Sequence, residues 1–561
     1  MSIQAYASLT SVSPGGTIDF MVSYDHGSSS PQFTIDFFRE GATEQPVGSQ
    51  VTGLQAESQA IPPDFNLNGC AWPKAYTLTV PNDWGGVYIA RLTGSTGDTA
   101  EVLFVVRAAS LGSNSKILLA LTVNTAQAYN EFGGSCLYSF PPTVQVPKVS
   151  FLRPGGLVYT FRTYGEQRFI SWAERNGFVL EYCTQIDLHG NPNLLNNYQL
   201  LLSVGHDEYW SKEMRDNVEA FIGNGGNVVF FSGNVCWWQV RFDNNNCTMI
   251  CYKSDENGPP DPTTDPQRTT IHWWDTPVLR PENTMTGVSY RGGAGWWGGP
   301  IIPERRYRGY TVANASHWVF NGTGLANGAT FGAGTSEENT IIGYETDACV
   351  PGQGGTPDNF VVLATADLRD WPKSSNVPAV GTAVIRDVNG QPVADTFTAT
   401  DKQAWVDGDD GVPGAATMGI YQRNGTVITV GTSNWAGGLS SDGNLGPIDQ
   451  ITQNILTTLS VLSISVTTAS PAMDVGTSQS FTATGTLSNG QVQDVTGAVS
   501  WSSSDTAVVI VSGNQATAVA PGQVTITATV GSVSGTASLT VNPTVAAEVM
   551  LEIQDTVPAK G

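Results

Sequence analysis

The chain has 561 residues, which is too long for one ordinary hydrophobic core, so we expect roughly three to four domains of ~100–200 residues each. An apolar content of 40% together with 31 prolines is typical of a globular, loop-rich protein and argues against a disordered or fibrous one. The formal charge of -23 includes no run of Lys and Arg, and no stretch of ~18 apolar residues occurs. We therefore expect no nucleic-acid partner and no membrane insertion.

Short runs of alternating apolar and polar residues fill the segment from 1 to 108. Clear examples are 17–23, 76–80 and 102–106, with turn residues between them. Alternation places every second side chain on one face of a strand, and this spacing of short strands is typical of a sandwich. We expect an N-terminal antiparallel β-sandwich over 1–108.

A continuous apolar run at 116–123 begins a second pattern, of the kind buried on both faces of a parallel sheet. Helical and strand patterns then alternate, and Ser211 can cap one of the helices. The expected helices are 164–176, 211–222 and 449–459, and the expected strands are 178–183, 198–204, 227–232, 340–343 and 425–430. We expect an open α/β sheet with amidotransferase- or flavodoxin-like layering over 109–460, with long loops inserted at about 243–339.

The segment 461–543 is rich in Ser, Thr, Val and Gly. Its elements at 474–477, 500–505 and 520–526 resemble, in order, a bacterial immunoglobulin-like group 2 module. The resemblance implies an Ig-like β-sandwich that acts as a spacer or an adhesive unit, and residues 544–561 then form a tail. Such a module favours the cell envelope or exterior, whereas the absence of a signal peptide in residues 1–8 is compatible with the cytoplasm. The sequence leaves the compartment open.

Seven cysteines form no even framework, so at least one thiol stays free or pairs between chains. Cys247 and Cys251 are spaced like half of a metal clip, but no second Cys or His pair accompanies them, which favours a structural loop. For Cys136 and Cys236 we expect packing roles.

Polar residues follow three of the predicted parallel strands, at 124–130, 205–210 and 233–238. In an open α/β sheet, ligands bind beyond the carboxyl ends of the strands, so these loops should place Tyr, His, Glu and Asn around one crevice. The chain has neither a G-x-S-x-G elbow nor an H-E-x-x-H motif. A strand-to-helix turn that could carry a nucleophile holds His206-Asp207-Glu208, so a Ser or Cys triad is disfavoured.

These loops carry a second resemblance. The runs 128–138, 205–210, 233–234 and 343–345 are similar, in order, to the C-terminal domain of the N,N-dimethylformamidase large (beta) subunit. The opening sandwich, with Gly86-Val87-Tyr88 near its end, resembles the domain before it. The likeness spans roughly 1–460. One departure is Asp207, at a position where we expect proline in the family's motif.

In that family two tyrosines and one glutamate hold a mononuclear iron, and the resemblance implies Tyr88, Tyr129 and Glu208 as ligands of mononuclear Fe(III) here. Phenolate and carboxylate are hard oxygen donors, which suit a ferric ion. The resemblance also implies that His206, Asn234 and Glu345 surround the metal. His206 or Glu345 could move protons, and Asn234 could donate to an oxyanion.

The implied activity is hydrolysis of the C–N bond of a small amide such as N,N-dimethylformamide. A homo-oligomer with a small accessory subunit is the implied assembly. Each residue also has an ordinary structural interpretation: a tyrosine late in a sandwich strand, such as Tyr88, commonly packs at a domain interface. The alternative function is a cell-surface glycan- or polymer-binding protein without catalysis. It is favoured by the tryptophan pairs at 237–238, 273–274 and 296–297, whose rings could stack on sugars.

Overall fold

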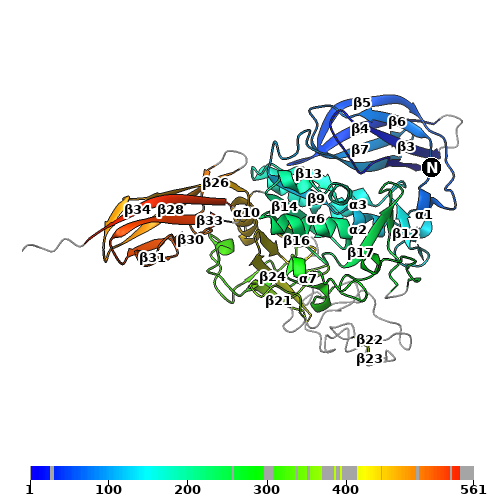
Figure 1. The fold of residues 1–561 in the computed structure, drawn as a ribbon. Helices are drawn as coiled ribbons and strands as arrows, with labels where there is room; N and C mark the ends of the chain where they lie inside the picture. The colour runs from blue at the N-terminus through cyan, green and yellow to red at the C-terminus, as the bar shows by residue number, and fades with distance from the viewer. Residues whose placement is uncertain are drawn as a thin grey trace, which may run out of the picture. The chain divides into compact units, whose positions relative to one another are not determined.

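The computed structural model describes residues 2–25, 31–254, 258–295, 307–335, 339–349, 354–368, 385–386, 392–394, 414–441, 443, 445–487, 492–530 and 533–543. The chain divides into two compact units, one running to Ser460 and the other beginning at Val461. Strands form most of the regular structure of both units (Figure 1). The predicted tail at 544–561 and the tryptophan pair at 296–297 lie outside the described residues.

Two sheets packed around a common core make up the N-terminal sandwich. One sheet has the order β1 (Ser2–Ala7), β3 (Thr17–Asp25), β6 (Lys74–Thr79). The other has the order β2 (Ser11–Val12), β8 (Thr99–Val106), β7 (Gly86–Gly94), β4 (Gln32–Glu40), β5 (Gln45–Gln55), and α1 (Phe65–Asn68) lies in the connection before β6. Phe20, Phe37 and Phe104 meet between the sheets. All strand pairs are antiparallel except the short β2–β8 pair, as the alternation predicts.

A nine-stranded sheet forms the centre of the same unit. Its strands, in spatial order, are β13 (Glu181–Thr184), β9 (Ile117–Leu121), β14 (Leu200–His206), β16 (Asn227–Gly233), β25 (Thr426–Thr429), β24 (Ala415–Gln422), β21 (Val361–Asp367), β19 (Tyr310–Val312) and β20 (Thr330–Phe331). The strands from β13 to β25 are parallel, and those from β25 to β20 are antiparallel. Every residue of β9, β14 and β16 is buried, which explains their continuous apolar sequences.

Helices cover both faces of this sheet. They are α2 (Val123–Ala128), α3 (Leu157–Thr163), α4 (Glu166–Arg175), α5 (Gln185–Gly190), α6 (Lys212–Gly223), α7 (Asn283–Thr286) and α10 (Pro447–Leu459). Leu119 of β9 shares a core cluster with Phe169 of α4, whereas its neighbour Leu118 belongs to the cluster that contains Met214 of α6. The predicted cap of α6 is confirmed, because Ser211 Oγ accepts a hydrogen bond from Met214 N at 3.2 Å. The finer likeness to amidotransferase- or flavodoxin-like layering stays a prediction.

Two expectations for this unit are wrong in detail. Residues 340–343 form no strand, because Thr432 Oγ1 hydrogen-bonds Ile341 O and Gly343 N and so replaces ladder partners. The segment expected as loops, 243–339, contributes β19 and β20 to the central sheet. These strands are only three and two residues long, too short to show a periodic pattern.

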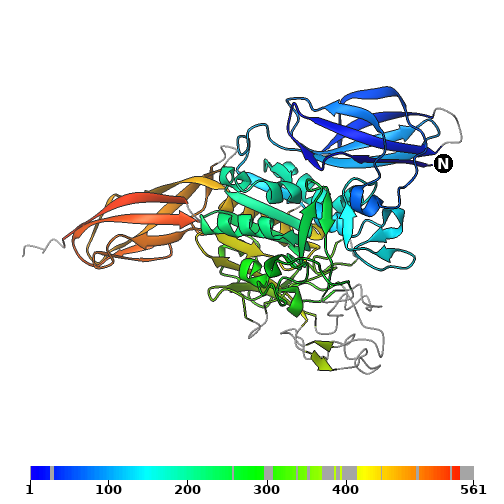
Figure 2. The same cartoon turned by 45° about the vertical axis from the view of Figure 1, so that its right-hand side comes forward.

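A small sheet beside the strand ends has the order β12 (Lys148–Ser150), β18 (Thr248–Ile250), β17 (Trp238–Asp243), β15 (Tyr209–Ser211). Its strands β15 and β17 begin shortly after β14 and β16 end, and all four belong to the green part of the ribbon in Figure 2. The remaining pairs are β10 (Ser135–Cys136) with β11 (Val144–Gln145), and β22 (Ile385–Arg386) with β23 (Pro392–Ala394). Short 3-10 helices lie at Phe132–Gly134, Leu194–Asn197, Pro266–Arg268, Tyr290–Gly292, Trp318–Phe320 and Trp435–Gly438.

The second unit is itself a β-sandwich. One sheet has the order β26 (Val461–Thr468), β28 (Ser478–Leu487), β32 (Gln515–Ala518), β31 (Val509–Ser512), with β29 (Val492–Asp494) also paired to β28. The other has the order β27 (Ala472–Asp474), β34 (Val533–Asn542), β33 (Gly522–Val530), β30 (Ser500–Ser503). Phe481, Ile526 and Leu539 lie in the core.

Two further findings concern the chain's chemistry. All seven cysteines are free thiols, so none of them forms the disulfides that the sequence permitted. In the part of the chain that the structure describes, no helix has the length and apolar character needed to span a membrane.

Candidate functional site

The carboxyl ends of three parallel strands deliver the polar side chains. Tyr129 follows β9 at the end of α2, His206 is the last residue of β14, and Asn234 comes directly after β16. Asn234 adopts a left-handed backbone with φ 51°, a conformation that Asn tolerates better than most residues. The Asp347 carboxylate accepts hydrogen bonds from the backbone N–H of Asn234 at 3.0 Å and of Val235 at 3.3 Å. The Asp347 carboxylate therefore fixes the backbone of the loop that carries Asn234.

Two phenols and one carboxylate meet at the centre of the site. Tyr129 Oη lies 3.0 Å from Glu208 Oε2, and Tyr138 Oη lies 2.7 Å from Glu208 Oε1. The two phenol oxygens are 3.0 Å apart, and Tyr209 Oη donates to Tyr138 Oη at 2.5 Å. Thr125 Oγ1 accepts from Glu208 N at 2.9 Å and fixes the backbone beneath the carboxylate. Three hard oxygen donors thus converge on one point.

A histidine–carboxylate pair adjoins these oxygens. His206 Nε2 lies 2.7 Å from Glu345 Oε2 and 3.4 Å from Glu208 Oε2. Asn234 Nδ2 donates to Glu345 Oε2 at 3.0 Å, so one carboxylate oxygen faces both the imidazole and the amide. All four side chains are buried. Of the six residues expected at the site, the structure brings together Tyr129, His206, Glu208, Asn234 and Glu345.

Burial and mutual charge set the acidity of these groups. Burial, reinforced by the Glu208 carboxylate, raises the pKa of Tyr129 and of Tyr138 well above the usual range. Burial also raises the pKa of Glu208, with Glu345 adding to the effect and His206 and Lys253 opposing it. Burial lowers the pKa of His206, but the carboxylates of Glu345 and Glu208 outweigh it, so the pKa lies above 6.5. Phenolates would need an added positive charge here, because burial alone keeps both phenols protonated.

Tyr88 does not join this cluster. Its ring stacks on Trp84 at 4.6 Å and on Phe104 at 5.6 Å, and its Oη accepts from Gly85 N at 3.1 Å. Side chains alternate along β7, so Tyr88 faces the core of the sandwich, whereas its neighbour Val87 joins the α/β core. The ligand role expected for Tyr88 therefore does not fit the structure, and the packing role does.

Tyr138 and Lys253 are the residues that sequence reasoning missed. Tyr138 ends the run 128–138 that carried the family resemblance, but nothing in the run distinguishes it from a packing tyrosine. Lys253 is 1% exposed, and its Nζ lies 3.4 Å from the centre of the Tyr138 ring and 4.4 Å from that of Trp238. Within the described residues Nζ has no hydrogen-bond partner. Its position after β18, in a segment without periodicity, gave no signal.

Asp207 turns away from the cluster. Its carboxylate accepts from Gln185 Nε2 at 2.5 Å, Ser203 Oγ at 2.5 Å and Trp210 Nε1 at 2.7 Å. Burial raises the pKa of this carboxyl to about 6, although the three donors oppose the shift. Asp207 therefore stabilises the loop after β14 by accepting these hydrogen bonds, and its carboxylate is not part of the Tyr129–Tyr138–Glu208 cluster.

Tyrosine rings form the rim of the site. Tyr164 and Tyr344 stand nearly perpendicular to the His206 ring, at 5.3 and 5.4 Å. These two rings, and those of Tyr129 and Tyr138, are only half-buried, whereas the carboxylates behind them are buried.

The paired tryptophans of the described loops are packed inward. Trp237, Trp238 and Trp273 are buried and Trp274 is half-buried. His272 stacks on Trp238 at 3.9 Å and on Trp274 at 5.5 Å. These rings wall the site, so they do not form the exposed stacking surface that a glycan binder would need.

The donor set limits what could hold a metal. Over the described ranges, no group of three or more His, Cys, Asp and Glu side chains is arranged to hold a metal ion. A metal at this site would therefore need the phenol oxygens of Tyr129 and Tyr138 in addition to Glu208.

Fold and site together define a multidomain, mostly β protein with a tyrosine–carboxylate centre at the strand ends of its mixed nine-stranded sheet. The family model for N,N-dimethylformamidase beta subunit-like proteins, C-terminal, matches residues 34–449, and the chain belongs to this family. The model for the bacterial Ig-like domain (group 2) matches residues 460–541, which confirms the expected C-terminal module.

Individual relatives match only short segments. The N,N-dimethylformamidase beta subunit of Alcaligenes sp is 30% identical over 73 residues, which cover 13% of this chain and 10% of that protein. Ice-binding protein 1 of Shewanella frigidimarina (strain NCIMB 400) is 48% identical over 67 residues, which cover 12% of this chain and 8% of that protein. The chain thus spans about a tenth or less of the length of these relatives.

One solved structure shows a remote likeness. It is a Paenibacillus sp. cycloisomaltooligosaccharide glucanotransferase complexed with cycloisomaltoheptaose, which is 8% identical. The match covers 40% of this chain and 44% of that chain, with a TM-score of 0.15. A likeness this low supports no statement about the fold.

Proposed function

We propose that the chain is an iron-dependent amidohydrolase that cleaves the C–N bond of a small amide, with N,N-dimethylformamide as the model substrate. Membership of the dimethylformamidase beta subunit-like family supports hydrolysis. The observation that carries the proposal is the convergence of Tyr129, Tyr138 and Glu208 oxygens within 3.0 Å of one another, beside a buried His206–Glu345 pair.

The residues fit a mononuclear Fe(III). Two phenols and a carboxylate are hard donors, and as anions they would neutralise a ferric charge. Burial opposes ionisation of both phenols, and a bound cation reverses that preference. We assign the second phenol to Tyr138 in place of Tyr88. When bound, iron would supply Lewis acidity toward a carbonyl and toward water.

The chain's own side chains account for the proton transfers. His206 Nε2 lies beside Glu345 Oε2, at 2.7 Å. This pair can therefore take a proton from the attacking water and return one to the leaving amine. Asn234 uses Nδ2 to orient Glu345, and the second hydrogen of the same amide remains for a carbonyl or oxyanion. Lys253 contributes positive charge behind the Tyr138 ring.

The half-buried rim favours a small substrate. Tyr129, Tyr138, Tyr164 and Tyr344 are partly exposed aromatic rings, which suit the alkyl groups of a small neutral amide. A homo-oligomer with a small accessory subunit stays a proposal from the family resemblance.

Metal analysis combined with an amidase assay tests the proposal. We expect near-stoichiometric iron in the purified protein and release of amine from formamide or dimethylformamide, both lost after removal of iron. Protein that is iron-free as isolated, gains no activity with added iron and hydrolyses no small amide would contradict it. That outcome, together with glycan retention, would favour the non-catalytic binding function.

A further inference from the structure

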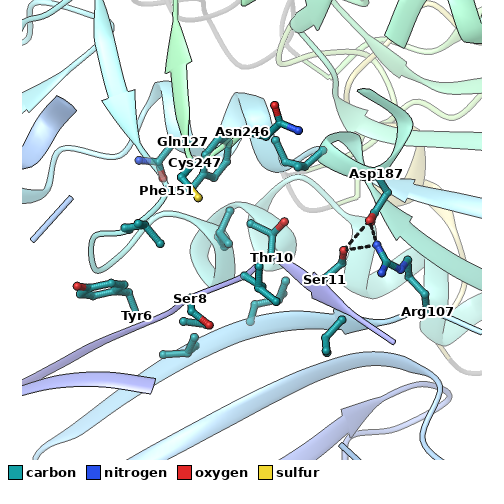
Figure 3. Close-up of a pocket in the computed structure, with 18 of the residues that line it drawn as sticks. Tyr6, Ser8, Thr10, Ser11, Arg107, Gln127, Phe151, Asp187, Asn246 and Cys247 are labelled. Atoms are coloured by element: carbon teal, nitrogen blue, oxygen red, sulfur yellow. Dashed lines mark hydrogen bonds and ion pairs between the residues drawn. The ribbon is translucent and has the colours of Figure 1, made fainter. Parts of the chain in front are cut away.

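A cavity of about 1090 Å³ lies where the sandwich meets the α/β part of the same unit. We call it the junction cavity. Ser8 and Thr10, between β1 and β2, line one wall, and Gln127, Phe151 and Asn246 line the wall opposite (Figure 3). None of the six side chains predicted for the amidase site lines it. The junction cavity is therefore a separate feature of the fold.

Hydrogen bonds and an ion pair tie the two walls together. Ser11 Oγ of β2 donates to Asp187 Oδ1 of α5 at 2.7 Å, and Arg107 of the sandwich pairs with the same carboxylate (Figure 3). Arg107 Nη2 also donates to Ser13 Oγ at 3.1 Å. A cavity braced in this way is pre-formed, which is typical of small-molecule sites.

The charged residues of the lining are all engaged by other groups of the protein. They are Glu101, Arg107, Arg153 and Asp187. Glu101 pairs with Arg162 at 2.6 Å and with Arg91 at 2.9 Å. Arg153 donates to the backbone carbonyls of Ser135 at 2.9 Å and Asn130 at 2.8 Å. Arg153 bonds carbonyls and not a carboxylate, but it is only 2% exposed, so its charge is not accessible from the cavity. A charged ligand would therefore lose its hydration without reaching an unpaired counter-charge, so the lining disfavours phosphates, carboxylates and amines.

Neutral polar groups and apolar faces make up the rest of the lining. Hydroxyls come from the half-buried Ser8 and Thr10, and amides come from Asn191 and Asn246, whereas the amide of Gln127 is buried and donates to Ser150 O. Leu9 is 45% exposed, and Tyr159 of α3 is 70% exposed. Hydroxyl and amide groups both donate and accept hydrogen bonds, and an exposed tyrosine ring offers a flat apolar face. A ligand that suits both would be uncharged, rich in hydroxyls and apolar on its ring faces.

We propose that the junction cavity binds a short neutral oligosaccharide. Sugar rings combine a rim of hydroxyl groups with apolar C–H faces, which is the combination that the lining offers. The volume of about 1090 Å³ lies just above the ~300–1,000 Å³ range of small-molecule sites, so it exceeds the need of a single small amide. The proposal does not depend on the amidase function, because it concerns different residues.

Calorimetric titration of the full chain tests the proposal. The probes are the neutral pentasaccharides of maltose, cellulose and chitin type, with a pentagalacturonate as the charged control. Tyr159→Ala removes the exposed ring and Thr10→Trp fills the cavity. Thr52→Trp places the same new side chain on an exposed position of β5 outside the lining. Thermal unfolding confirms that each variant is folded.

We expect at least one neutral pentasaccharide to bind, with about tenfold or greater weakening in Tyr159→Ala and Thr10→Trp and little change in Thr52→Trp. Pentagalacturonate should bind much more weakly. The proposal is overturned if no neutral pentasaccharide binds at millimolar concentration, if binding survives both cavity variants, or if the charged sugar binds equally well. Since Tyr159→Ala alters only a largely exposed side chain, a folding failure of Thr10→Trp leaves the test intact.

Discussion

His206 and Glu345 lie 139 positions apart in the sequence, yet His206 Nε2 and Glu345 Oε2 are 2.7 Å apart in the folded chain. His206 ends a central parallel strand, and Glu345 lies in the loop that the backbone of Ser433 holds at 3.0 Å. Both side chains are buried. This pair separates the proton-transfer part of the site from the phenol–Glu208 part.

Substitutions in the two parts should have different effects. Glu208→Ala should lose both iron and activity, because two phenols alone leave a ferric ion short of one hard anionic donor. Glu345→Gln and His206→Asn should keep iron and fold but lose ~10²–10⁴-fold in turnover, because they remove acid–base groups. Iron content and amide hydrolysis on all three variants check this. If His206→Asn empties the site while Glu208→Ala keeps iron, the two roles are reversed.

The second prediction compares Tyr138 with Tyr88. Two phenolate ligands should give the iron-loaded protein a visible tyrosinate-to-iron absorption. Tyr129→Phe and Tyr138→Phe should each weaken or remove that absorption, because each loses a direct donor. Tyr88→Phe should keep it, since the structure has Tyr88 Oη hydrogen-bonded to the backbone of Gly85 in the sandwich. A spectrum lost in Tyr88→Phe but retained in Tyr138→Phe would return the ligand role to Tyr88.

The strand ends were predictable from sequence because burial on both faces makes β9, β14 and β16 continuously apolar. The loops after them carry Tyr129, Glu208 and Asn234 by topology alone. Tyr88 was assigned by resemblance, and strand alternation turns its ring into the sandwich core. Tyr138 and Lys253 reach the site through tertiary packing of irregular segments, and no local periodicity encodes such packing.

The third prediction concerns Lys253, whose substitution should change the stability of the fold and the turnover at the site in opposite directions. A buried ammonium that lies on aromatic faces is costly, so Lys253→Met, which has similar length, should stabilise the fold by about 1–3 kcal/mol. The same change should lower turnover and shift the visible absorption, because a positive charge behind Tyr138 is lost. Chemical denaturation and spectroscopy on one preparation measure both effects. A destabilised variant with unchanged spectrum and turnover would assign Lys253 a purely packing role.

The module after Ser460 should be dispensable for hydrolysis. Every residue assigned to the amidase site lies in the first compact unit. A chain ending at Ser460 should therefore keep its iron and its turnover within about twofold, as distant sites usually behave independently. Activity per bound iron is the measurement. A truncated protein that is folded and iron-loaded but inactive would show that the module takes part in the reaction.

The last prediction concerns stability and pH at Glu166. Burial raises the pKa of this carboxyl to about 8 from its ordinary 4.5, although hydrogen bonds from Thr122 oppose the shift. Between these pH values the folded chain holds a proton that the unfolded chain has released, so the free energy of unfolding falls as pH rises. One such proton corresponds to a slope of about 1.4 kcal/mol per pH unit.

Glu166→Gln keeps an acceptor for Thr122 and removes the titration, so its free energy of unfolding should depend less steeply on pH by about that amount between pH 5 and 7.5. Relative to the parent protein, the variant should therefore gain stability as the pH rises. Glu57→Gln, at an exposed carboxylate, is the control and should leave the slope unchanged. Urea unfolding at several pH values measures the difference. Parallel curves for the parent and Glu166→Gln would show that Glu166 is already ionised in the folded chain at pH 5.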